Sequence, residues 1–167
     1  MNETYLFGFT EAKENELKIM LDIYNHYIVN STATFDWDKI TLEEFKNRIF
    51  MNNNKYKTFL IYINNELIGF CFLTRFREKI AYDKTVELGL YLKPQFTGKG
   101  YGKEIVRYME NIARLNQFET IIVSISGENV ASLKLFRKLK YEQCSHYKGI
   151  AMKFGRKIDI IDFQKVI

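Results

Sequence analysis

The stretch Gln95-Phe96-Thr97-Gly98-Lys99-Gly100-Tyr101-Gly102 carries three glycines at alternate positions. It follows an apolar segment with the pattern of a strand and precedes an amphipathic segment with the period of a helix. Glycines leave backbone N–H groups unobstructed by Cβ atoms, and the first turn of a helix adds unpaired donors and a positive dipole end. The stretch therefore predicts a backbone cradle for an anion, and the expected guest is a pyrophosphate.

Two widespread phosphate-binding patterns do not fit this stretch. A Walker loop needs Ser or Thr after its Gly-Lys pair, but Glu104 follows Gly102-Lys103. A dinucleotide-binding loop needs a glycine three residues after Gly100, where Lys103 stands. The pattern that remains is Gln-x-x-Gly-x-Gly, at Gln95, Gly98 and Gly100. It resembles the coenzyme A loop of the GNAT superfamily of acetyl-CoA-dependent N-acetyltransferases; the alternative is a glycine-rich turn that only joins a strand to a helix.

The composition is that of a globular chain with a sizeable core. The 167 residues are 47% hydrophobic and 16% aromatic, and the single proline makes long loose linkers improbable. The first residues show no basic segment followed by an apolar one, and no apolar run approaches the length that spans a membrane. We therefore expect one domain over residues 1–167, a cytoplasmic location and no membrane partner.

The net charge of +5 and the isoelectric point of about 9.1 make a nucleic-acid partner the first alternative. The distribution of the basic residues argues against it. Many follow the glycine loop or lie on a later helical segment: Lys99, Lys103, Arg107, Lys134, Arg137, Lys138 and Lys140. Such a patch suits the phosphates of coenzyme A, although each lysine is equally typical of a solvated helix face. We expect no nucleic-acid partner, and the spacing of cysteines and histidines predicts no metal site.

The hydrophobic periodicity predicts helices over 14–29, 42–51, 101–115 and 129–139, and strands over 5–9, 57–63, 66–76, 85–92, 119–126 and from 141 onward. Thr41 and Glu44 form a capping-box pattern, and Asn64-Asn65 predicts a tight hairpin turn. Gly89 predicts a bulge or a close backbone approach. The strands on either side of the third helix should be parallel, as in a βαβ unit. The expected fold class is α/β (α+β), a mixed and mostly antiparallel sheet with helices on both faces and one parallel strand pair at the glycine loop.

Further blocks follow each other in the order found in the phosphinothricin and methionine-sulfoximine N-acetyltransferases, a group within the GNAT superfamily. They are Asn25-His26-Tyr27, Ser31-Thr32-Ala33-Thr34-Phe35, Ala81-Tyr82-Asp83, Thr85-Val86-Glu87, the glycine loop, Asn129-x-x-Ser132, Lys153-x-Gly155-x-x-x-Asp159 and Gln164. The resemblance extends from the first helix to the C-terminus. It implies a GNAT fold, acetyl-CoA as co-substrate, a small-molecule amine as acceptor and a homodimer.

By this resemblance Glu87 is the general base. An ordinary Glu, with a pKa of about 4.3, is a poor direct base for an α-amine with a pKa of about 8. We therefore expect Glu87 to act as the base in a partly desolvated site and through a water molecule. The alternative is a strand carboxylate that is paired with a lysine.

The resemblance also implies the residues that bind acetyl-CoA. The backbone of Leu90, Tyr91 and Leu92 would bond the acetyl oxygen and the pantetheine arm. The pyrophosphate would lie on Gln95, Gly98, Lys99, Gly100, Tyr101, Gly102 and Lys103, and Asn129 and Ser132 would contact the pantetheine arm. Apolar residues at 90–92 are equally typical of a buried strand, and Asn129 is equally suited to cap a helix.

Phe136 departs from the group that the chain resembles, where a histidine stands at this position. Phenylalanine cannot donate a proton, so the general acid for the thiolate is unassigned. Water or another tyrosine, such as Tyr141, could take that role. A coenzyme A thiol is acidic enough to leave with little help. Phe136 therefore leaves the identity of the general acid open, while acetyl transfer is still expected.

For the acceptor, the resemblance points to Arg75, Arg77, Tyr27, Phe35 and Thr85. A guanidinium suits a free α-carboxylate through a bidentate bond, although arginines on exposed strands are common. Three functions therefore stay open. The chain acetylates the α-amine of a small amino-acid analogue of the phosphinothricin, methionine sulfoximine or methionine sulfone type; or it acetylates a protein N-terminus, a lysine or a polyamine; or it binds coenzyme A or nucleic acid without catalysis.

Overall fold

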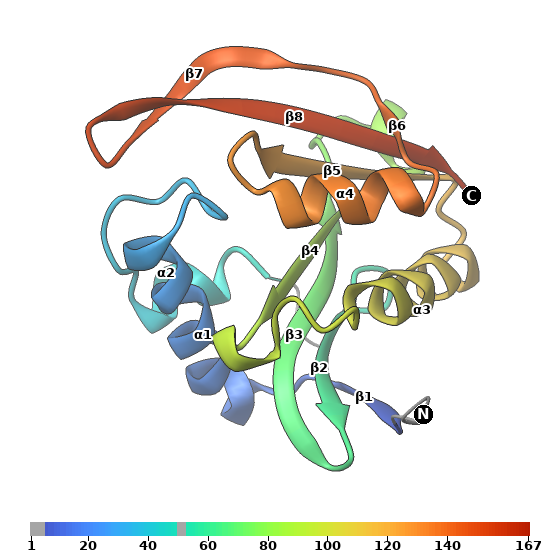
Figure 1. Ribbon diagram of the computed structural model, residues 1–167. Coiled ribbons are helices and arrows are strands. Elements are labelled where there is room, and N and C mark those ends of the chain that lie inside the picture. The colour runs from blue at the N-terminus through green and yellow to red at the C-terminus, as the bar shows by residue number, and fades with distance from the viewer. Residues whose placement is uncertain (1–5, 50–52) are drawn as a thin grey trace.

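The computed structural model describes residues 6–49 and 53–167. Eight strands form one sheet in the order β1-β2-β3-β4-β5-β8-β6, with β7 also paired to β8 (Figure 1). The strands are β1 (Phe7–Glu11), β2 (Thr58–Ile63), β3 (Glu66–Arg75), β4 (Thr85–Leu92), β5 (Thr120–Ser126), β6 (Glu142–Gln143), β7 (Tyr147–Lys153) and β8 (Arg156–Val166). The helices are α1 (Leu17–Asn30), α2 (Leu42–Lys46), α3 (Gly102–Leu115) and α4 (Val130–Lys138).

The predicted parallel pair is confirmed, and it is short. β4 pairs with β5 in parallel at Thr85, Val86 and Glu87, whose partners are Thr120, Ile121 and Ile122. All other pairs of the sheet are antiparallel. Both strands continue past these residues, to Leu92 and to Ser126, but the described part of the chain forms no β4–β5 pair beyond Glu87. The two strands therefore part in the middle of the sheet, and the fold predicted from the sequence, with one parallel pair at the glycine loop, is confirmed.

Each face of the sheet carries its own core. Ile105, Val106 and Met109 of α3 pack with the β4 residues Val86 and Leu88. On the other face, α1 and α2 pack over β2 and β3, and Tyr91 of β4 lies against that second core. Because successive side chains of a strand alternate between the faces, Glu87 shares its face with Tyr91 and not with α3.

The second helix begins as predicted and ends earlier. Thr41 accepts a hydrogen bond from the Glu44 N–H, and the Glu44 carboxylate accepts one from the Thr41 N–H, which completes the capping box. α2 ends at Lys46, so the predicted helix over 42–51 is wrong after that residue within the described chain; Met51 lies outside the described residues. After Lys46, Arg48 forms an ion pair with Asp36 and Ile49 is buried.

Two local predictions are confirmed. Asn64 and Asn65 both adopt positive φ angles, 49° and 68°, in the turn between β2 and β3. At Gly89 the chain makes a close approach, because a Cβ atom there would lie 2.1 Å from the Cζ of the Phe72 ring. In the part of the chain that the structure describes, no helix combines the length and apolar character needed to cross a bilayer.

Candidate active site

A cleft of about 530 Å³ opens where β4 and β5 part. Its walls come from β4, β5, the glycine loop and α4, and Tyr27 of α1 and Ala33 also line it. Twelve of the residues that line it bear directly on the predictions: Tyr27, Glu87, Leu90, Tyr91, Leu92, Gly98, Gly100, Tyr101, Gly102, Asn129, Ser132 and Phe136. The structure thus gathers most of the predicted cofactor residues and the predicted base around one cavity.

The glycine loop has the backbone that a cradle requires. Gly98 and Gly100 have φ angles of 73° and 84°, and no atom lies within 4 Å of where their Cβ atoms would be. Glycine is needed at both positions because of the backbone conformation and not because of crowding. At Gly102 the reason differs, since a Cβ would lie 2.7 Å from Cδ2 of Leu135. That close approach brings the N-terminus of α3, with its unpaired N–H groups, against α4.

Three residues predicted around this loop do not line the cleft. Gln95, Lys99 and Lys103 are exposed, and the Lys99 ammonium lies over the Phe96 ring, 5.2 Å from its centroid. Two lysines of α4, Lys134 and Lys138, do line it. They lie on one helix face, four residues apart. This spacing within a basic segment is the feature of the sequence that points to them as cleft residues.

Glu87 is half-buried and lines the cleft. Burial raises the pKa of its carboxyl above the usual range, and the negative charge of Asp162 raises that pKa further. No lysine, arginine or histidine among residues 6–49 and 53–167 forms an ion pair with Glu87. The alternative of a lysine-paired structural carboxylate therefore has no partner within the described chain, and the environment is the one that proton uptake by Glu87 requires.

The backbone of β4 beyond Glu87 is open on its β5 side. β3 pairs with Leu90, Tyr91 and Leu92 on the other side, so alternate N–H and C=O groups of this segment face the cleft. The hydroxyl of Tyr27 donates a hydrogen bond to the Leu92 carbonyl. The open edge supplies the N–H donors that a thioester carbonyl and an amide-containing arm would use.

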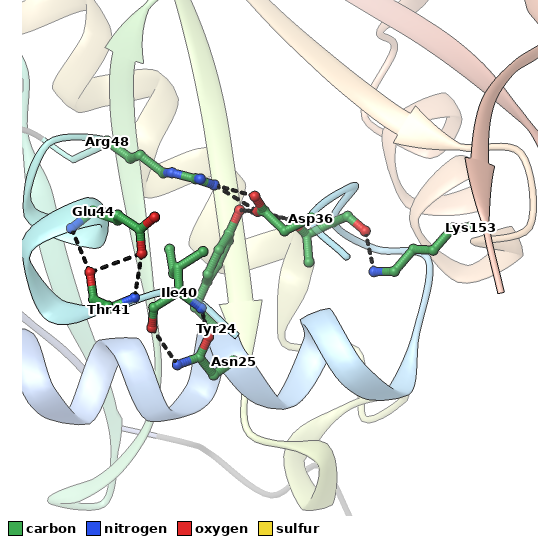
Figure 2. A network of polar contacts seen from close by, with 9 residues as sticks. Tyr24, Asn25, Asp36, Ile40, Thr41, Glu44, Arg48 and Lys153 are labelled. Carbon is green, nitrogen blue, oxygen red and sulfur yellow. Dashed lines mark hydrogen bonds and ion pairs between the residues drawn. The ribbon is translucent and has the colours of Figure 1, made fainter. Parts of the chain in front are cut away.

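A polar network holds the loop between α1 and α2 beside Tyr91. The Tyr24 hydroxyl lies 2.8 Å from Thr34 Oγ1 and 2.9 Å from the Asp36 carboxylate. Both oxygens of that carboxylate also accept a hydrogen bond from Arg48 Nη1, each at 2.7 Å. Figure 2 shows how Asp36 lies between Tyr24 and Arg48, while the Asn25 amide bonds the backbone of Ile40. Ala33 of this loop lines the cleft and Phe35 does not.

Lys153 fastens the same loop from the far side. Its side chain comes from the end of β7, is only 2% exposed, and donates a hydrogen bond of 2.7 Å to the Thr34 carbonyl (Figure 2). Burial lowers the pKa of the Lys153 ammonium, and the charge of Asp36 opposes that effect. This buried bond joins the β7–β8 hairpin to the loop that contains Ala33, a residue of the cleft lining.

We expect Lys153→Met to lower the free energy of unfolding by about 1–3 kcal/mol, because it leaves the Thr34 carbonyl without its charged donor. Urea denaturation measures the loss. Lys157→Met, at an exposed position of β8 in the same hairpin, is the matched control and should change stability little. Equal stability of the two variants would show that the buried bond does not hold the loop.

The predicted acceptor residues are dispersed. Arg75 is exposed, and its guanidinium lies over the ring of Tyr56, a residue of the core on the α3 side, because Arg75 is paired with Val86 and shares its face. Arg77 is exposed and stacks on Phe76 and Tyr82. Within this chain neither arginine lines the cleft.

Thr85 stands on the Glu87 face, two residues earlier in β4, and lies outside the cleft lining. Its role as an acceptor residue stays a prediction, as does that of Phe35. Tyr27 alone among the five predicted acceptor residues lines the cleft within the described chain.

At α4, Asn129 caps the helix. Its side-chain oxygen accepts a hydrogen bond of 3.1 Å from the Ser132 N–H, and both residues line the cleft. Phe136 is buried in the cleft wall, and Tyr141 packs behind it with ring centroids 5.0 Å apart. Burial raises the pKa of Tyr141, and its side chain does not line the cleft, so the structure does not support Tyr141 as the general acid.

One polar pair at the cleft was missed in the sequence. Ser124 of β5 lines the cleft, and its hydroxyl donates a hydrogen bond of 2.7 Å to Oδ1 of Asp162 on β8. Alternating polar residues in a strand look the same whether they face solvent or a site, and the contact depends on the pairing of β5 with β8.

The chain matches one protein family over most of its length. The sequence profile of the Acetyltransferase (GNAT) family matches residues 20–141. The chain is 24% identical over 156 residues to the phosphinothricin N-acetyltransferase of Streptomyces coelicolor, which covers 91% of each chain. It is 24% identical over 158 residues to the L-methionine sulfoximine/L-methionine sulfone acetyltransferase of Pseudomonas aeruginosa, covering 92% of this chain and 91% of that one.

Solved structures share the fold. The phosphinothricin acetyltransferase of Sinorhizobium meliloti, determined in complex with acetyl-CoA, superimposes with a TM-score of 0.87 at 25% identity. The match covers 96% of this chain and 88% of that protein.

Proposed function

The chain belongs to the GNAT family of acetyltransferases, and on that premise we propose that it transfers acetyl from acetyl-CoA to the α-amine of a small amino-acid analogue of the phosphinothricin, methionine sulfoximine or methionine sulfone type. The observation that carries the proposal is the cleft between β4 and β5. It is lined both by a glycine loop with positive φ angles and by a half-buried carboxylate, Glu87, that has no ion pair within the described chain. Named relatives over nine-tenths of the chain support the class of acceptor.

Each part of the cleft has a task in this reaction. The N–H groups of the glycine loop and of the first turn of α3 would hold the pyrophosphate of acetyl-CoA. The open edge of β4 at Leu90–Leu92 would bond the thioester oxygen, where negative charge develops. Glu87 would accept the proton of the attacking amine through a water molecule as the C–N bond forms and the C–S bond breaks. We assign the proton of the released thiolate to solvent, because the Phe136 side chain has no proton to donate.

A second candidate acceptor is a more cationic amine: a protein N-terminus, a lysine side chain or a polyamine. It is favoured by the acidic character of the acceptor face, where Glu87 and Asp162 stand without an ion pair within the described chain, while Arg75 points to the other face. A screen of amines for coenzyme A release from acetyl-CoA separates the candidates. The panel holds phosphinothricin, methionine sulfone, a lysine peptide and spermidine. If none of these amines causes release of coenzyme A, only a coenzyme A-binding role would remain.

We expect amino acids with a free α-carboxylate to be acetylated more efficiently than their amides. A charge-assisted hydrogen bond to the carboxylate is worth about 2–3 kcal/mol, which corresponds to roughly thirtyfold or more in kcat/KM. The resemblance implies Arg75 or Arg77 as the donor, and alanine at the contacting position should abolish the preference. Neither arginine lines the cleft within this chain, so a preference that survives both substitutions would place the donor elsewhere. Equal kcat/KM for methionine sulfone and its amide would favour the second candidate.

We also retain a homodimer and a cytoplasmic location as parts of the proposal. Both are implied by the resemblance to the phosphinothricin acetyltransferase group. Sedimentation velocity of the purified chain tests the first, and fractionation of cells that express it tests the second.

A further inference from the structure

Three polar side chains stand in a row on one face of the sheet. Glu87 of β4 is paired with Ile122 of β5, and Ser124, two residues further along β5, is paired with Asp162 of β8. Residues two apart in a strand share a face, as do directly paired residues. Two strand spacings of about 4.8 Å separate β4 from β8, and Asp162 lies two residues, or about 6.6 Å, further along, so the two positions lie roughly 12 Å apart across β5.

Asp162 is held in place at several points. Its side-chain Oδ1 accepts the hydrogen bond of 2.7 Å from the Ser124 hydroxyl. Its backbone N–H donates to Ser145 Oγ at 3.2 Å, and its carbonyl accepts from the Cys144 N–H at 2.9 Å. Within residues 6–49 and 53–167 no cationic side chain forms an ion pair with Asp162. Its negative charge is therefore fixed in position and is not neutralised by a partner.

We propose that Asp162, oriented by Ser124, is a positioning residue that makes Glu87 a stronger base. A fixed negative charge on the same face favours proton uptake by Glu87, because it disfavours a second carboxylate charge nearby. The inference rests on the proposed role of Glu87 as the base. Asp162 itself does not line the cleft, so it would act on Glu87 through its charge and not by contact with a substrate.

The other titratable groups around Glu87 cannot supply this effect. Tyr91 comes from the same strand, and burial keeps the pKa of its hydroxyl well above the usual value, so Tyr91 is neutral. Tyr24 of α1 also has a raised pKa, caused first by burial. Asp36 of the following loop is charged but ion-paired with Arg48. Thr74 of β3, paired with Glu87, does not titrate. Lys134 and Lys138 of α4 line the same cleft, but a positive charge would favour the ionised carboxylate and so could not raise its pKa. Among the described residues, Asp162 is the charge that contributes, after burial, to the raised pKa of Glu87.

The chemical benefit follows from the mismatch between base and amine. A carboxylate whose pKa lies nearer that of the amine takes up a proton with a smaller unfavourable free-energy change. Ser124 serves this purpose in two ways. Its hydrogen bond fixes the direction of the Asp162 carboxylate, and its small side chain leaves the cleft wall between the two acids open.

The test is a charge-removing and nearly isosteric substitution, Asp162→Asn, which preserves an acceptor for the Ser124 hydroxyl. The pKa of Glu87 is measured by NMR titration of its side-chain carboxyl carbon in the full chain, and its signal is identified by its absence in Glu87→Gln. We expect the titration midpoint to fall by about 0.3 to 1 pH unit, the range that Coulomb's law gives for unit charges roughly 12 Å apart. The acidic limb of the kcat/KM profile should move to lower pH by the same amount.

Two further variants sharpen the result. Ser124→Ala should give a smaller shift in the same direction, because Asp162 keeps its charge but loses its fixed orientation. Glu66→Gln removes one negative charge from the exposed start of β3 and should shift neither the midpoint nor the profile. An unchanged Glu87 midpoint in Asp162→Asn would overturn the inference. Full activity of Glu87→Gln would instead overturn the proposed base, and the two failures are distinguishable because the NMR titration needs no turnover.

Discussion

Glu87→Gln is expected to bind acetyl-CoA and the acceptor amine with unchanged affinity and to turn over about a hundredfold more slowly or worse, the usual contribution of a positioned general base. Glutamine keeps the size and the hydrogen-bonding capacity of the side chain but cannot take up a proton. Glu87 is half-buried and lines the cleft without an ion pair in the described chain, so its replacement by a neutral group should leave the fold intact.

The pH dependence distinguishes a base from a binding group. Burial and Asp162 raise the pKa of Glu87, so the activity of the unmodified protein should fall as the pH drops through that raised value. In Glu87→Gln this limb should vanish, and the remaining activity should rise with pH as the free amine becomes available. The deficit should therefore shrink as pH increases. Glu119→Gln, at an exposed position just before β5, is the control, and full turnover of Glu87→Gln at pH 7 would mean that Glu87 is structural.

The parts of the fold predicted from the sequence are those that local chemistry determines. The capping box at Thr41 and the positive φ angles at Asn64-Asn65 depend only on neighbouring residues. The parallel pairing of β4 with β5 follows from the single helix between them, because a right-handed crossover allows little else. The glycine loop could also be predicted from local sequence, because its positive φ angles depend on Gly98 and Gly100 themselves.

What the sequence did not reveal depends on contacts between distant strands. Arg75 was predicted at the acceptor, but its pairing with Val86 turns it onto the α3 side, and a shift of one residue would reverse that face. The bond between Ser124 and Asp162 joins residues of two strands 38 positions apart. The ion pair between Arg48, just after α2, and Asp36 likewise joins residues on either side of a loop. Patterns of residue type give the faces of an isolated strand, but only the register of the sheet shows which polar side chains meet.

The second large effect is expected at Gly100→Val, which should weaken coenzyme A binding by about ten- to a hundredfold. Gly100 has a φ of 84°, and holding a β-branched residue in such a conformation costs on the order of 1–3 kcal/mol. No atom lies within 4 Å of the position a Cβ would take, so the valine can be accommodated by a change of the local backbone without disturbing the core. That change turns the N–H groups away from the direction in which they converge on an anion, and the affinity falls for this reason.

Gly155→Val is the matched control for that experiment. Gly155 has a φ of 71° in the turn between β7 and β8, with nothing within 4 Å of a Cβ, and it does not line the cleft. The two substitutions therefore impose a similar strain, and thermal denaturation should show similar losses of stability. Calorimetric titration with coenzyme A should show weakened binding in Gly100→Val alone. Unchanged affinity in a folded Gly100→Val protein would mean that the loop is only a turn between strand and helix, and the phosphate cradle would have to be sought along Lys134 and Lys138 of α4.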